Sequence, residues 1–151
     1  GPMPTELEGP VAEHLRERGR EYGTTTGRPR RCGWLDLVAL RHSARLSGAT
    51  ELAIMLLDVL AGLEQLKVCT HYRVGERLLD QFPAAAEDLA AAEPVWVQLP
   101  GFSEEISGCR RWQDLPAAAR AYLGDIEIYV GVPVSMVSVG PERGQTLARP
   151  R

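Results

Sequence analysis

The chain has 151 residues, of which 44% are hydrophobic and 25% are charged, a composition typical of a soluble globular protein of about one domain. Its formal net charge of −3 argues against a broad basic face of the kind that coats nucleic acid. No apolar leader or membrane-length apolar run is visible, and the three cysteines and three histidines lie apart without the spacing of a metal site. We therefore expect a cytoplasmic protein without nucleic-acid, membrane or metal partners.

The first third of the chain predicts two helices joined by an arginine-rich loop. Residues 6–20 carry apolar side chains four residues apart, and residues 34–46 repeat that pattern up to Gly48, a plausible helix stop. The loop at 23–31 would then precede a helix N-terminus, where exposed amides and the helix dipole favour anions. Residues 51–57 read ELAIMLL, a run that is apolar after Glu51, and they predict a strand buried on both faces.

The rest of the chain alternates predicted strands and helices. Strands are expected at 66–74, 78–82, 93–99 and 132–137, and helices at 84–92 and 115–130. Pro100 and Gly101 are expected to end the third of these strands, while Pro116 and Gly131 flank the last helix. The fold class is therefore α/β, a mixed sheet flanked by helices, and no domain boundary is visible within residues 1–151.

The segment from Gly23 to Asp36 reads GTTTGRPRRCGWLD and is the most specific local pattern in the chain. Its glycines permit backbone conformations closed to other residues, and its three arginines offer forked donors suited to carboxylate or phosphate. It supplies no catalytic base. The pattern therefore predicts an anion-binding loop, with a solvated basic patch as the alternative.

Two further positions follow predicted strands. Asp58 comes at the end of the 51–57 run, and in open α/β sheets ligands gather at the carboxyl ends of strands. The alternative is that Asp58 caps the next turn. Residues 138–143 (SVGPER) form a second strand-to-loop junction after the last predicted strand. Both positions are candidate ligand contacts.

Six separated blocks resemble the adenylosuccinate synthetase family in order and spacing. They are PTEL at 4–7, YGTTTGRPRRCGWLD at 22–36, LDVL at 57–60, LKVC at 66–69, GVPV at 131–134 and SVGPER at 138–143. The resemblance implies a purine-biosynthetic ligase that forms adenylosuccinate from IMP and L-aspartate while GTP is hydrolysed to GDP and phosphate with magnesium. It also implies the C-terminal portion of a P-loop-NTPase-like fold and a homodimeric parent enzyme.

The resemblance also implies roles for individual positions. An aspartate loop would comprise Thr24, Thr25, Thr26, Gly27, Arg28, Pro29 and Arg30, with Arg28 also reaching IMP and Arg30 reaching GTP. Guanine contacts would come from Leu56, Leu57, Asp58, Ser138, Val139 and Gly140. At position 56 the sequence departs from the family, which usually has lysine there, and leucine cannot donate to the guanine oxygen. Arg31 is expected to give structural support.

The phosphate loop, catalytic aspartate and catalytic histidine of the family precede the region that these blocks match. We therefore expect residues 1–151 to form a single substrate- and GTP-binding portion that holds no catalytic residue and no magnesium ligand, and is inactive alone. The alternative is a stand-alone, non-catalytic ligand-binding or interaction module derived from the enzyme. An open sheet edge would favour self-association of either form.

Overall fold

The computed structural model describes residues 1–151 and confirms a mixed α/β fold with mixed sheets. Contacts within the chain define two compact units, the first made of Gly1–His42 with Lys67–Val97 and the second of Ser43–Leu66 with Gln98–Arg151. The boundaries fall inside helix α2 (Leu37–Ser47) and strands β3 (Leu63–Val74) and β5 (Glu93–Phe102). No change of composition marks them because they interrupt regular elements rather than linkers.

The first unit is built around a sheet centred on β3. Its other elements are α1 (Pro10–Gly19), β1 (Leu35–Asp36), β4 (Arg77–Leu79) and α3 (Ala86–Ala90). Strand β1 pairs parallel to β3, with Leu35 opposite Val68, while β4 pairs antiparallel to β3 and β5 also pairs with β3. The helix predicted from residue 34 therefore begins three residues later, because residues 35 and 36 are taken up by the sheet.

The core of the first unit joins α2 to β3. Val38, Cys69 and Tyr72 are buried together, and partly buried hydrophobic residues, including Phe82 and Trp96, pack against them. The Tyr72 hydroxyl donates to Oδ2 of Asp36, whose Oδ1 accepts the Ala39 N–H at 3.0 Å at the start of α2. Burial, reinforced by the bond to the Asp36 carboxylate, raises the pKa of Tyr72 far above its usual value.

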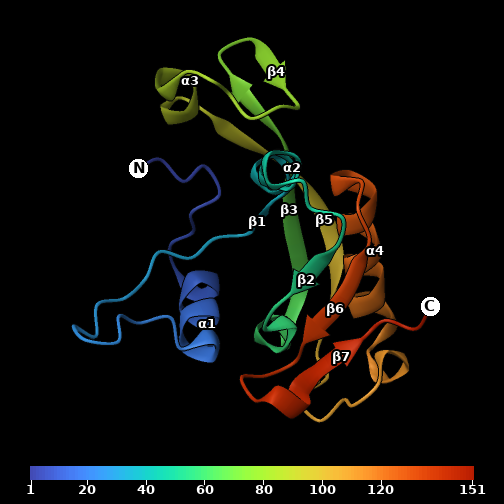
Figure 1. Ribbon diagram of the computed structural model, residues 1–151. Coiled ribbons are helices and arrows are strands. Elements are labelled where there is room, and N and C mark those ends of the chain that lie inside the picture. Colours follow the sequence, from blue (N-terminus) through green and yellow to red (C-terminus); the bar gives the residue numbers. More distant parts are fainter. The chain divides into compact units, whose positions relative to one another are not determined.

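The second unit contains a three-stranded sheet with helix α4 packed beside β6 (Figure 1). Its further elements are β2 (Leu52–Ile54), η1 (Leu57–Leu60), η2 (Trp112–Asp114), α4 (Ala117–Val130), β6 (Val134–Ser138), η3 (Arg143–Gln145) and β7 (Thr146–Ala148). The strand order is β2-β6-β7, with β2 parallel and β7 antiparallel to β6. The predicted 115–130 helix is confirmed, and Gly131 ends it in the left-handed conformation.

A carboxylate on α4 ties this helix to both neighbouring segments. Glu127 accepts the Val134 N–H at 2.7 Å at the start of β6, and it pairs with Arg149, which follows β7. The Arg149 guanidinium also lies over the Trp112 ring, 5.3 Å from its centroid. These contacts hold the chain that follows β7 against α4.

Two strand predictions are wrong in instructive ways. The 51–57 run forms a strand only at Leu52–Ile54, which is half-exposed, because the chain turns away at Leu56 and enters a 3₁₀ helix. Gly101 does not end β5, which continues through it to Phe102. A Cβ at Gly101 would lie 1.8 Å from the Leu63 carbonyl oxygen, so glycine is what lets β5 pass β3 this closely.

The remaining differences are small. The predicted 78–82 strand is Arg77–Leu79, and β7 adds a strand that was not predicted after β6. The longest helix, α4, has 14 residues. No helix combines the length and apolar character needed to cross a bilayer.

Candidate functional site

Residues 21–30 form a closed hairpin-like loop after α1. Arg30 N–H donates to the Glu21 carbonyl at 2.9 Å, and Gly23 N–H donates to the Arg28 carbonyl at 2.8 Å. Gly27, with φ 65°, turns the chain at the tip and donates to the Gly23 carbonyl at 2.8 Å. In Figure 1 the segment between α1 and β1 extends away from α1 as a long excursion. The anion-binding pattern of the sequence is thus displayed on a hydrogen-bonded loop.

The predicted position of this loop at a helix N-terminus is wrong. Helix α2 begins at Leu37, and strand β1 separates it from Arg31. The first turn of α2 is capped by the Asp36 carboxylate, which accepts the Ala39 N–H. Because an acidic side chain already occupies that helix end, the loop has to attract anions with its own side chains and amides.

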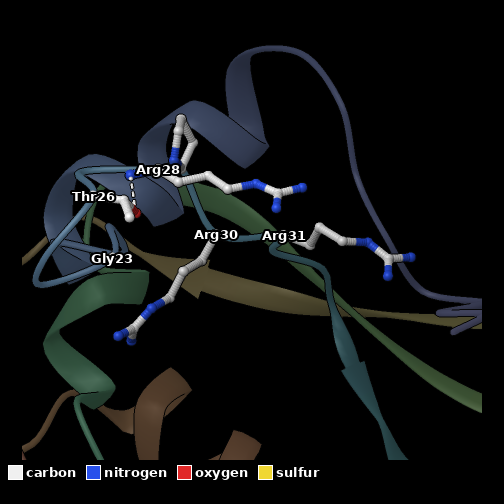
Figure 2. A pocket seen from close by; sticks show the side chains of 6 residues that line it. Gly23, Thr26, Arg28, Arg30 and Arg31 are labelled. Atoms are coloured by element: carbon white, nitrogen blue, oxygen red, sulfur yellow. Dashed lines mark hydrogen bonds between the residues drawn. The ribbon is translucent and has the colours of Figure 1, made fainter.

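The loop encloses an open hollow of about 310 Å³ (Figure 2). Its lining residues are Gly23, Thr26, Arg28, Pro29, Arg30 and Arg31. Thr26 Oγ1 accepts the Arg28 N–H at 3.3 Å, and residues 24–30 are all exposed. This volume lies at the small end of ligand sites, and three guanidiniums make the hollow suitable for a small anion.

The three arginines of the hollow have different partners. Arg31 pairs with Glu6 at 2.6 Å and donates to the Gly1 carbonyl at 2.9 Å, in agreement with its expected structural role. Arg30 pairs with Glu21 at 3.0 Å. The Arg28 guanidinium has no ion pair or hydrogen bond and extends into the open in Figure 2. Arg28 is therefore the cation available to a ligand.

The second group of predicted residues meets where β2 and β6 end. The Leu56 N–H donates to Ser138 Oγ at 2.6 Å across 82 positions of sequence. Leu56 adopts the left-handed conformation, with φ 55° and ψ 46°, which is unusual for a residue with a side chain. The structure therefore brings the 56–58 and 138–140 segments together. Both segments follow the carboxyl ends of neighbouring parallel strands, where ligand sites of α/β sheets are found.

Some of the hydrogen-bond donors and acceptors of this second group already have partners within the chain. Val139 N–H donates to the Gln145 carbonyl at 2.8 Å. Ser138 Oγ accepts from Leu56, so its own hydroxyl proton remains able to donate. Asp58 lies inside η1 and Leu56 holds the N-cap position, so the capping alternative for Asp58 is wrong. One hydroxyl donor and one carboxylate acceptor are thus held on adjacent segments.

Tight backbone packing shapes the 138–140 segment. A Cβ at Gly140 would lie 2.2 Å from Oε1 of Gln145, whose Nε2 in turn donates to the Ser107 carbonyl at 3.2 Å. Leu57 is 1% exposed and anchors η1 in the core. Leu57 and Val139 therefore act through packing and backbone rather than through ligand-facing polar groups.

The loop at 24–30 belongs to the first unit, and the group formed by 56–58 and 138–140 belongs to the second. No three His, Cys, Asp or Glu side chains gather anywhere to hold a metal ion. We assign no step to a metal in this chain. The sequence analysis did not name Glu21. The glycines at 23 and 27 are a hairpin signal, and a hairpin that turns between them sets Glu21 opposite Arg30.

Comparison with known proteins gives a consistent family. A family sequence model described as adenylosuccinate synthetase matches residues 1–147. The chain is 51% identical to an adenylosuccinate synthetase of Halothermothrix orenii over 99% of its length, and 54% identical to one of Desulforudis audaxviator over 97%. A solved structure of fully ligated adenylosuccinate synthetase from Plasmodium falciparum superposes with TM-score 0.93 at 38% identity over 99% of this chain. The chain spans about a third of the length of these relatives, 35%, 34% and 36% respectively.

Proposed function

This chain belongs to the adenylosuccinate synthetase family, and on that premise we propose that its two groups of polar residues bind substrates of a GTP-dependent ligase. In this reaction GTP transfers its γ-phosphoryl group to the six-position oxygen of IMP, giving GDP. The amine of L-aspartate then displaces the phosphate, and adenylosuccinate and inorganic phosphate leave. The 24–30 loop binds aspartate in this scheme, and the 56–58 and 138–140 group binds guanine.

The observation that carries the proposal is the Arg28 guanidinium, which has no partner and lines the hollow beside Thr26. Aspartate has two carboxylates, and charge-assisted bidentate bonds from a planar guanidinium fix such a group in orientation as well as in place. Orientation matters because the amine must approach one ring carbon from one direction. Arg28 also reaches the IMP ribose in this proposal, and Arg30 reaches GTP.

The second group recognises guanine because its hydrogen-bond donors and acceptors are complementary to those of the base. The Asp58 carboxylate accepts from the ring N–H and the exocyclic amine, while the Ser138 hydroxyl donates to the guanine oxygen. Leu56 packs against the base and adds no donor. We therefore expect GTP to support turnover faster than ATP or ITP, and equal rates with the three nucleotides would remove Asp58 as the guanine reader.

We place residues 1–151 as the C-terminal substrate- and GTP-binding portion of the ligase, with its phosphate loop, its acid and base groups and its magnesium ligands outside this portion. The proposed working enzyme is a cytoplasmic homodimer. Residues 1–151 alone self-associate in this proposal through the open edge of β2, which pairs only with β6. Sedimentation that shows a compact monomer at high concentration would contradict that last point.

The decisive experiment replaces Arg28 by leucine in the full-length enzyme. Removing one partner of a desolvated charge pair costs about 2 kcal/mol or more, so the KM for aspartate should rise at least about 30-fold. The matched control is Arg45→Leu in the last turn of α2, at an exposed arginine outside both groups. A KM for aspartate that is unchanged in the Arg28 variant would refute the proposed role of the loop.

Titration calorimetry of the 151-residue chain separates the proposal from a stand-alone binding module. The proposal expects L-aspartate and GTP to bind only when the remaining part of the enzyme is present. Binding of either ligand to the chain alone, with the affinity of the full-length enzyme, would favour the module.

A further inference from the structure

Glu21 holds Arg30 by both its backbone and its side chain. The Arg30 N–H donates to the Glu21 carbonyl at 2.9 Å, and the guanidinium Nη1 donates to Oε2 of the Glu21 carboxylate at 3.0 Å. On its other side, the Arg30 carbonyl accepts Nε of Arg16 at 3.0 Å. Arg30 is therefore fixed at the base of the loop and its charge is already matched by a carboxylate.

Arg28 and Arg30 are not arranged to hold one small ligand together. In Figure 2 their side chains leave the loop in different directions, and Arg30 extends away from Arg28 and Arg31. Of the three arginines that line the hollow, only Arg28 has a guanidinium without a partner. For a short dicarboxylate to be held by both arginines, the Arg30 side chain has to leave Glu21 and turn towards the ligand.

We propose that Glu21 is a positioning residue that acts as a competing carboxylate: it occupies Arg30 until a carboxylate of the substrate replaces it. The inference rests on the proposed function, in which this loop binds L-aspartate. Arg28 makes the first contact, and the transfer of Arg30 from Glu21 to the ligand completes the site. One arginine–carboxylate pair is exchanged for another, so the loop can rearrange without leaving the Arg30 guanidinium unpaired.

The exposure of the pair sets the size of the effect. The Arg30 side chain is 56% exposed and that of Glu21 is 34% exposed, so water and salt screen their attraction. Exposed ion pairs of this kind change an equilibrium by a factor of about 1.5 to 5. The competition is therefore large enough to lower the apparent affinity for the substrate measurably and small enough for the substrate to overcome.

The test is steady-state kinetics of full-length Glu21→Gln, a change that keeps side-chain size and removes the charge. We expect the KM for aspartate to fall about 1.5- to 5-fold with kcat and the KM for IMP unchanged, and the difference from wild type to shrink at high salt. Asp88→Asn is the matched control, because it removes an ion pair of the same kind and of similar exposure from Arg77, outside the loop. It should leave the KM for aspartate unchanged.

Glu21→Asp separates competition from simple repulsion of the substrate. It keeps the negative charge but withdraws the carboxylate by one methylene, so competition expects a lower KM for aspartate and repulsion expects the wild-type value. A KM for aspartate that stays constant or rises in Glu21→Gln overturns the inference. If that happens while Arg28→Leu still raises the KM, the aspartate loop stands and only the role of Glu21 is wrong. If Arg28→Leu is also silent, the proposed function itself fails.

Discussion

Replacing Tyr72 by phenylalanine should destabilise the first unit by about 2 kcal/mol. Tyr72 is fully buried, and its hydroxyl donates to the Asp36 carboxylate that also caps α2. The ring remains in Tyr72→Phe, so no cavity forms, and the loss is that of a hydrogen bond to a charged group, about 1.5–3 kcal/mol. For a chain of this length the loss corresponds to a fall in Tm of about 4–8 °C. Urea unfolding of the 151-residue chain, followed by circular dichroism, measures it.

The matched control is Tyr122→Phe on α4. Tyr122 is 7% exposed, and burial is the only cause that raises the pKa of its hydroxyl. The same atomic change there removes no side-chain partner and should lower the free energy of unfolding by less than Tyr72→Phe does. If Tyr72→Phe costs no more than Tyr122→Phe, the Tyr72–Asp36 bond contributes nothing net and the reasoning is wrong.

Two further predictions concern close packing and burial. Gly101→Ala should lower the free energy of unfolding in urea by at least about 2 kcal/mol, because the new Cβ would meet the Leu63 carbonyl. The control Gly124→Ala, in an open helical position, should raise it by about 0.5–1 kcal/mol. Equal effects of the two changes would show that β5 moves aside freely. Burial raises the pKa of the Cys69 thiol to about 12. A pKa raised in the folded state stabilises the protein below the ordinary value near 9, so the free energy of unfolding should fall as the pH rises from about 9 towards 12. Cys69→Ala should reduce that slope, and an identical alkaline profile would contradict the prediction.

The sequence predicts best the elements whose signals are local. Helix α4 follows from an apolar pattern between Pro116 and Gly131, and the structure ends it at the expected glycine. By contrast, residues 35 and 36 look helical by periodicity and become a strand, because pairing with β3 lies more than thirty positions away. The passage of β5 through Gly101 likewise depends on a partner strand that no local pattern reveals.

The candidate site shows the same division. The types of residue in the 24–30 loop are enough to predict an anion ligand, whereas the choice of L-aspartate as that anion belongs to the proposed function. Sequence alone does not show that Arg30 is engaged by Glu21 while Arg28 is not, because that depends on the pairing across the loop. The sequence also predicts a helix N-terminus directly after the loop. In the structure strand β1 follows the loop instead, and the Asp36 carboxylate caps α2.

The left-handed backbone at Leu56 constrains how this position can change. Residues other than glycine, asparagine and aspartate bear a cost of about 1 kcal/mol at φ 55°, so leucine and lysine bear it equally and differ there only in side-chain chemistry. Valine, isoleucine and threonine fit this conformation worst. Substitution at position 56 can therefore vary the proposed contact with a nucleotide base while the backbone that binds Ser138 stays fixed, provided the new side chain is unbranched at Cβ.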